Sequence, residues 1–170
     1  MFGTTVHRAI FLIAIGGIAV GLPLNKIVLS LGGMLVSLNW LLEGGFSSKW
    51  ELFKSNRLAQ LLLALFFIHV LGLLWTEDLS YGFHDIKIKL PLLFLPIVLS
   101  TTRSLNEIER KWILSLFLGA VVVTSLINWI VFVHDGLDDD MEMRNMSLFT
   151  SHIRYSLLVV FALCISVYLA

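Results

Sequence analysis

The sequence predicts an all-α fold, a polytopic transmembrane helical bundle of about six spans with its amino terminus in the cytoplasm. First, 58% of the 170 residues are hydrophobic and only 14% are charged, whereas globular proteins are roughly 45–50% apolar and about 25% charged. Second, the apolar residues gather in stretches close to the length of about 20 residues that a helix needs to cross the hydrocarbon core. Third, most of the tryptophans fall near the ends of these stretches, where indole rings favour the headgroup zone. They are Trp40, Trp75, Trp112 and Trp129.

The first two spans cover residues 9–24 and 27–42. Only Asn25 and Lys26 separate them, just after Pro23, so we expect a tight helical hairpin. Gly17 and Gly21 form a GxxxG pair in the first span. Such a pair allows another helix to approach closely, which makes an assembly contact one interpretation of this motif.

The remaining spans cover residues 58–75, 88–100, 112–134 and 155–170. The stretch 88–100 is short, and Pro91 and Pro96 each remove a helical hydrogen bond, so we expect it to be kinked or only partly spanning. The last stretch ends inside apolar sequence at Ala170. We therefore expect the chain to be the amino-terminal part of a longer protein, organised as one transmembrane region over residues 1–170.

Basic residues near span ends predict the orientation, because they are more frequent on the cytoplasmic side. Seven lie on the side of the amino terminus and five on the opposite side. The two sets are Arg8, Lys49, Lys54, Arg57, Arg103, Arg110 and Lys111, against Lys26, Lys87, Lys89, Arg144 and Arg154. This bias predicts a cytoplasmic amino terminus.

Two loops have apolar residues at helical spacing. In the cytoplasmic loop, Phe46, Trp50 and Phe53 predict an amphipathic helix along the membrane surface, with Lys49 and Lys54 turned away from the apolar face. In the outer loop 76–89, the apolar face is predicted to comprise Leu79, Phe83, Ile86 and Leu90, leaving His84, Asp85 and Lys87 toward water or a ligand.

Composition excludes several function classes. Twelve Lys and Arg balance twelve Asp and Glu, so the chain lacks the basic excess that nucleic-acid binding requires. Cys164 is the only cysteine, which excludes an internal disulfide, and its apolar surroundings predict a small buried side chain. The consecutive acids 138–140 have no EF-hand spacing, so no metal is expected. No Walker loop, GxSxG, HExxH or CxxC motif is present.

The candidate site residues lie in the second outer loop, which precedes the last span. Arg144 and Arg154 offer planar guanidinium forks that suit the diphosphate of a membrane-anchored lipid. His152 could add a hydrogen bond or move a proton. The alternative interpretation is that Arg154 only flanks its span and extends its charge to the interface.

His69 is a second candidate, as a possible intramembrane polar site in the middle of the third span. A buried ionisable group is costly, which favours a functional role. The alternative is a neutral imidazole bonded to a neighbouring helix, near Asn128 or Gln60.

Three stretches resemble the O-antigen ligase and polymerase superfamily of bacterial membrane proteins. They are LGLLWTEDLSY at 71–81, DIKIKLPLLFLPIVLS at 85–100 and RNMSLFTSHIRYSLLVVFAL at 144–163. In the last, Arg144 and Phe149 occupy positions where the family often has an arginine and an aromatic residue. The chain departs from the family pattern at Ser147, where a glycine is common, and at residues 151–153, where Ser-His-Ile replaces an Asn-Pro-Asn-like turn. The likeness covers about residues 55–170.

This resemblance implies a glycosyltransferase of lipopolysaccharide biosynthesis in the bacterial inner membrane. Such proteins move a glycan from an undecaprenyl-diphosphate carrier to lipid A core, or to a growing polysaccharide, at the periplasmic face without a cofactor or metal. The resemblance implies diphosphate binding by Arg144 and Arg154, with His152 catalytic. Family members carry further catalytic residues in a carboxyl half, so this chain alone is expected to be inactive.

Two other functions remain open. One is a transporter or lipid-carrier flippase, in which His69 and the Pro91 and Pro96 kink line a path. The other is a noncatalytic membrane subunit that assembles through Gly17 and Gly21. The sequence predicts neither the sugar and acceptor nor the oligomeric state.

Overall fold

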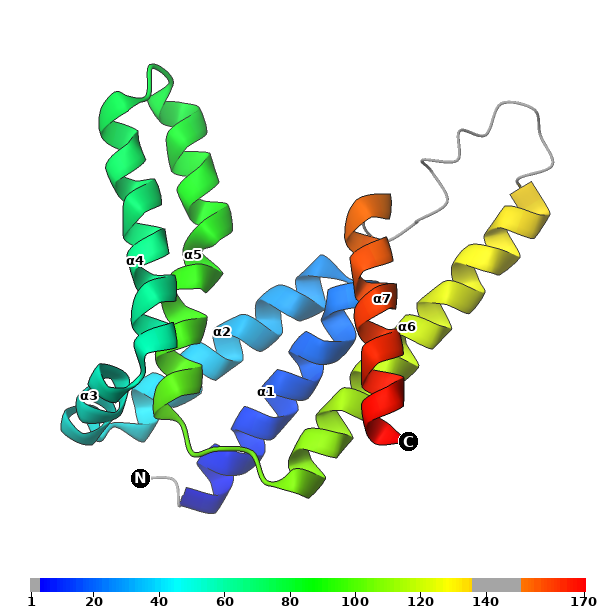
Figure 1. Cartoon of the computed structure of the whole chain (residues 1–170), viewed down its shortest axis with the longest axis horizontal. Helices are drawn as coiled ribbons and strands as arrows, with labels where there is room; N and C mark the ends of the chain where they lie inside the picture. Colours follow the sequence, from blue (N-terminus) through cyan, green and yellow to red (C-terminus); the bar gives the residue numbers. More distant parts are fainter. Residues whose placement is uncertain (1–3, 136–150) are drawn as a thin grey trace. The chain divides into compact units, whose positions relative to one another are not determined.

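The structure, a computed structural model, describes residues 4–135 and 151–170. These residues form seven α-helices and one short 3-10 helix, with no strand among them (Figure 1). The helices are α1 (Thr4–Leu24), α2 (Lys26–Glu43), α3 (Phe46–Ser55), α4 (Arg57–Gly72), η1 (Leu73–Trp75), α5 (Leu79–Thr101), α6 (Glu107–Asp135) and α7 (His152–Leu169). The prediction of an all-α helical bundle is confirmed.

Five helical segments in the described part of the chain are long and apolar enough to cross a membrane. They are Thr5–Leu24, Lys26–Glu43, Arg57–Trp75, Glu107–His134 and His152–Leu169. Each corresponds to an expected span, and together they identify a membrane protein. The orientation of the chain stays a prediction.

The remaining expected span, residues 88–100, is the carboxyl-terminal part of α5. This helix is 23 residues long and continues through both Pro91 and Pro96. It is not among the five because its first half carries Asp85, Lys87 and Lys89. The predicted loop helix over Leu79–Leu90 and the predicted fourth span are therefore one element.

The described residues divide into two compact units, one of residues 4–7 and 36–104 and the other of residues 8–35, 105–135 and 151–170. The division falls within α1 and α2. In the second unit, close contact between these two helices depends on glycine. A Cβ on Gly21 would lie 2.5 Å from the Leu29 backbone nitrogen, and one on Gly32 would lie 2.9 Å from the Ala14 carbonyl oxygen. The predicted hairpin is thus held by glycines on both helices.

The two glycines of the GxxxG motif have different surroundings in the structure. Gly21 faces α2 of its own chain, whereas a Cβ on Gly17 would meet nothing within 4 Å. The two glycines therefore do not share one contact surface in this structure. Gly21 packs against α2 in the hairpin, and assembly through both glycines stays a prediction.

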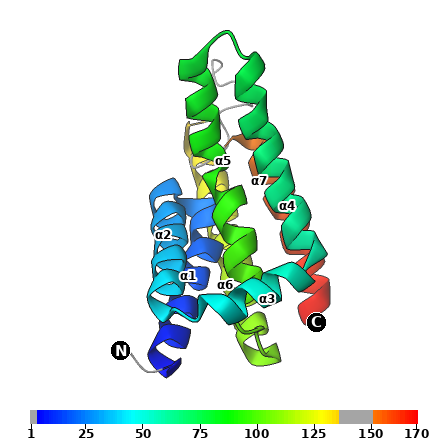
Figure 2. The same ribbon diagram turned by 90° about the vertical axis from the view of Figure 1, so that its left-hand side faces the viewer.

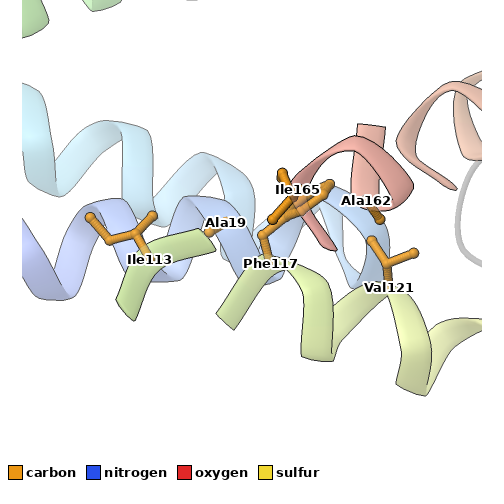
Figure 3. Close-up of a cluster of buried hydrophobic side chains, with 6 residues drawn as sticks. All are labelled: Ala19, Ile113, Phe117, Val121, Ala162 and Ile165. Atoms are coloured by element: carbon orange, nitrogen blue, oxygen red, sulfur yellow. The ribbon is translucent and has the colours of Figure 1, made fainter. Parts of the chain in front are cut away.

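The core of the second unit joins α1, α6 and α7 (Figure 3). α6 contributes a stripe at intervals of four residues, which places its side chains on one face of the helix. The buried side chains are Ala19, Ile113, Phe117, Val121, Ala162 and Ile165. The Phe117 ring also packs edge-on against that of Phe161, with centroids 5.6 Å apart. Apolar packing thereby fixes α7 against α6.

In the first unit, α4 and α5 lie side by side as an antiparallel pair, joined by η1 (Figures 1 and 2). α3 contacts both of them and runs across their ends. It begins after Gly44 and Gly45, whose φ angles of 71° and 68° lie in the left-handed region that favours glycine. Asn56 caps α4 by accepting a hydrogen bond from the Ala59 amide at 3.1 Å.

The predicted amphipathic helix is present as α3, but its faces differ from the prediction. Lys49 is buried together with Phe53, whereas Phe46 and Trp50 are 52% and 57% exposed. The Lys49 ammonium group donates to the Trp40 carbonyl at 2.9 Å and pairs with Glu43 at 2.8 Å. It also lies 4.7 Å from the Trp40 ring centroid. These compensating contacts, which spacing cannot predict, allow the lysine to face inward.

Candidate functional site

The amino-terminal turn of α7 carries two of the predicted site residues. Ser151 is its N-cap residue but makes no side-chain capping bond. His152 and Arg154 follow it in the first turn, and both are exposed. Within residues 4–135 and 151–170, Arg154 forms no ion pair. Its guanidinium group is therefore not neutralised by a described carboxylate.

The backbone adds to the positive character of this turn. The first intrahelical bond runs from the Tyr155 amide to the Ser151 carbonyl at 3.0 Å. The amides of residues 152–154 precede it, so they are not used within the helix. Helix amino termini attract anions because these amides and the helix dipole point toward them. Arg154, His152 and these amides together form a turn suited to an anionic group.

Tyr155 fixes this turn against α6. Its hydroxyl lies 2.7 Å from the Ser125 hydroxyl, a hydrogen bond in which either oxygen can donate. The same Tyr155 oxygen lies 3.4 Å from the Val121 carbonyl. Because Tyr155 follows Arg154 directly, the bond holds the beginning of α7 in place beside α6.

Other predictions about the outer loop cannot be compared with the structure. Arg144 and the acids 138–140 lie outside the described residues. The structure thus places His152 and Arg154 in one turn and leaves the position of Arg144 undetermined. Cys164, further along α7, is exposed, so the prediction of a buried thiol is wrong. Its face of the helix points away from the core residues Ala162 and Ile165.

His69 lies on α4, in the first unit. Its Nδ1 atom donates to the Leu65 carbonyl of the same helix at 2.8 Å, since a carbonyl oxygen can only accept. Gln60, one of its expected partners, instead donates to the carbonyls of Phe53 and Lys54 at 3.2 and 2.6 Å. The hydrogen bond of His69 is therefore local to α4 and does not join it to a second helix.

A buried polar pair was missed by sequence reasoning. His7 Nδ1 lies 2.8 Å from Asn39 Oδ1, and Asn39 Nδ2 donates to the His7 carbonyl at 3.0 Å. Both residues are less than 9% exposed. The signal available in the sequence was a lone amide side chain within the apolar span 27–42.

A partly buried ion pair was missed as well. The Arg8 guanidinium pairs with Glu109, with a 3.0 Å bond from Arg8 Nε to Glu109 Oε1. Glu109 also accepts from the Asn106 amide at 2.9 Å while its own amide donates to Asn106 Oδ1 at 2.8 Å. This reciprocal arrangement is a capping box at the start of α6. The Asn-x-x-Glu spacing could have revealed it.

Among the described residues, no group of three or more His, Cys, Asp or Glu side chains is placed to hold a metal ion. No family model, curated protein or solved structure matches the chain. The first turn of α7 is therefore considered on its own geometry.

Proposed function

We propose that this membrane protein is part of an O-antigen ligase-like glycosyltransferase. It would move a glycan from undecaprenyl diphosphate to lipid A core or to a growing polysaccharide at the periplasmic face of the bacterial inner membrane. Arg154 and Arg144 hold the carrier's diphosphate, and His152 orients it or assists proton transfer. The resemblance of residues 55–170 to that superfamily motivates the reaction.

The observation that carries the proposal is the first turn of α7. It brings an exposed guanidinium, which no carboxylate of the described residues neutralises, together with His152 and the amides that the first turn of the helix does not use internally. α7 is itself long and apolar enough to span a membrane, so this turn lies at the end of a candidate span. A diphosphate whose lipid tail stays in the bilayer has its charge at the same depth. The position of the α7 turn at the end of a candidate span and its positive charge therefore both support binding of a lipid-linked diphosphate.

The chemistry follows from where charge develops. When the bond between the sugar carbon and the diphosphate oxygen breaks, negative charge grows on the leaving diphosphate. A positioned guanidinium stabilises that charge more strongly than it stabilises the bound donor. The acceptor hydroxyl must also lose a proton, and a neutral imidazole such as that of His152 can accept one.

The test replaces Arg154 with Gln in the gene that encodes this chain and measures glycan on the cell surface. A charge-assisted hydrogen bond contributes about 1.5–3 kcal/mol, so we expect the initial rate of glycan attachment to fall by about 10- to 100-fold. Lys26→Gln is the matched control, because Lys26 is also exposed at a helix start and is predicted to lie on the same side of the membrane.

Unchanged glycan attachment in Arg154→Gln would reject this role for Arg154. His69→Leu separates the proposal from the transporter alternative. We expect glycan attachment to be unaffected by that change, because the His69 side chain bonds to the Leu65 carbonyl of its own helix. Loss of attachment in His69→Leu, with Arg154→Gln unchanged, would favour a transport path through α4.

A further inference from the structure

A cavity of about 540 Å³ lies in the first unit, beneath α3. The end of α2, α3 itself, α4 and the carboxyl end of α5 contribute its walls. Aromatic and aliphatic side chains predominate among the lining residues, which include Trp40, Phe46, Trp50, Phe53, Leu63 and Ile97. Its volume falls within the roughly 300–1,000 Å³ that is common for small-molecule sites.

Three of the polar groups at this cavity, on Trp40, Thr101 and Lys49, already have partners, and Ser47 also contributes to its wall. Trp40 Nε1 donates to Thr101 Oγ1 at 2.7 Å, and the Thr101 hydroxyl donates to the Ile97 carbonyl at 2.7 Å. The Lys49 ammonium is bonded to the Trp40 carbonyl and to Glu43. None of these groups requires a polar ligand. The interior is therefore suited to a hydrocarbon chain.

Two further cations follow the cavity-lining part of α3 in the sequence. The Lys54 ammonium lies 5.4 Å from the centroid of the Trp50 ring, which is part of the cavity wall. Arg57 begins α4 three residues later and is exposed. In the described ranges 4–135 and 151–170, neither cation forms an ion pair, nor does the nearby Glu51. A site with an apolar interior, a cation over one of its wall residues and a second cation three residues along the chain is complementary to an anionic amphiphile.

We propose that this cavity, which we call the α3 pocket, binds an acyl chain of an anionic phospholipid whose phosphate is held by Lys54 and Arg57. The position of α3 supports a lipid, because its exposed Phe46 and Trp50 are typical of a helix at the membrane interface. Anionic headgroups are attracted to exposed lysine and arginine at such a surface. The proposal does not depend on glycan transfer, since the α3 pocket and α7 belong to different units.

The test counts phospholipids retained by the purified chain in native mass spectrometry. The chain is mixed in detergent with equal concentrations of dioleoyl-phosphatidylglycerol and dioleoyl-phosphatidylcholine. We expect preferential retention of phosphatidylglycerol. Lys54→Gln should weaken that retention by about fivefold, the equivalent of about 1 kcal/mol for one cation near a charged surface. Lys26→Gln, at the start of α2, should leave it unchanged.

Occupation of the cavity itself is tested with a matched pair on α4. Leu63 lines the α3 pocket, whereas Leu61 is 68% exposed and does not. Leu63→Trp fills the cavity and should reduce phosphatidylglycerol retention more than tenfold, while Leu61→Trp should not. Far-UV circular dichroism of both variants establishes that the helices are intact. If Leu63→Trp does not fold, the proposal is tested by the loss of phosphatidylglycerol retention in Lys54→Gln and by the preference of the unchanged chain for phosphatidylglycerol over phosphatidylcholine.

Three results would overturn the proposal. The first is equal retention of the two lipids by the unchanged chain. The second is equal retention of phosphatidylglycerol by Leu63→Trp and Leu61→Trp. The third is a bound species that proves to be a second copy of the chain.

Discussion

Neighbouring glycines on α2 provide a sharp test of how α1 and α2 pack. A Cβ on Gly32 would lie 2.9 Å from the Ala14 carbonyl oxygen and 3.0 Å from the Ile18 backbone nitrogen, whereas one on Gly33 would meet nothing within 4 Å. Ordinary contacts between carbon atoms are about 3.5–4.0 Å. The overlap involves backbone, so Gly32→Ala can be accommodated only if α1 moves away.

The two substitutions should have opposite effects on the free energy of unfolding. Overpacking costs about 1–3 kcal/mol, and replacing glycine by alanine in a helix gains about 1 kcal/mol. Gly32→Ala should therefore destabilise the chain by up to about 2 kcal/mol, while Gly33→Ala should stabilise it by up to about 1 kcal/mol. Because the gain in helix propensity is common to both, the difference between them, about 1–3 kcal/mol, measures the contact.

The assay is reversible unfolding of the purified chain in mixed micelles of dodecyl maltoside and increasing dodecyl sulfate, followed by circular dichroism. Gly21→Ala and Gly17→Ala form a second pair with the same expected order, since only Gly21 approaches α2 closely. Equal midpoints for Gly32→Ala and Gly33→Ala would refute the packing described here. Equal midpoints for Gly21→Ala and Gly17→Ala would likewise refute the close contact between Gly21 and Leu29 near the turn.

Three further substitutions test polar contacts by the same unfolding assay. Asn39→Leu removes both hydrogen bonds that join Asn39 to the buried His7 and should cost about 1–3 kcal/mol; no loss would mean that the pair is not buried. Glu109→Ala removes both a capping bond and the ion pair with Arg8 and should cost about 1–2 kcal/mol, part of which should disappear at high salt. Tyr155→Phe removes one interhelical hydrogen bond and should cost only about 0.6 kcal/mol, so a loss above about 2 kcal/mol would contradict its described role.

Most helices could be predicted because lipid imposes a simple rule on the sequence. A spanning helix must satisfy its own backbone, so apolar stretches of sufficient length identify it without knowledge of its neighbours. The first two spans and the turn at Asn25 follow this rule, and so does the long α6. α5 does not, because its charges at Asp85, Lys87 and Lys89 interrupt the pattern although the helix continues.

The contacts between helices were predicted less well. Helical spacing placed Lys49 on the outer face of α3, and only the positions of Trp40 and Glu43 show why it turns inward. Similarly, a GxxxG motif shows that a close approach is possible but not which glycine makes it. Such contacts depend on residues distant in sequence.

For the candidate site, sequence placed His152 and Arg154 just before a span, and both lie in the first turn of α7. The spacing of two residues guarantees that they share a turn. It could not predict that the Tyr155 hydroxyl would bond to Ser125, because that contact requires the packing of α6 against α7. Their chemistry toward a diphosphate stays a prediction.

The most direct test of the central claim is the affinity of the purified chain for undecaprenyl diphosphate, measured beside undecaprenol as a probe without charge. If Arg154 holds the diphosphate, Arg154→Gln should weaken binding of undecaprenyl diphosphate by about 10- to 100-fold and leave undecaprenol binding unchanged. Lys26→Gln should bind both as the unchanged chain does. Equal affinity of Arg154→Gln and the unchanged chain for undecaprenyl diphosphate would contradict the claim.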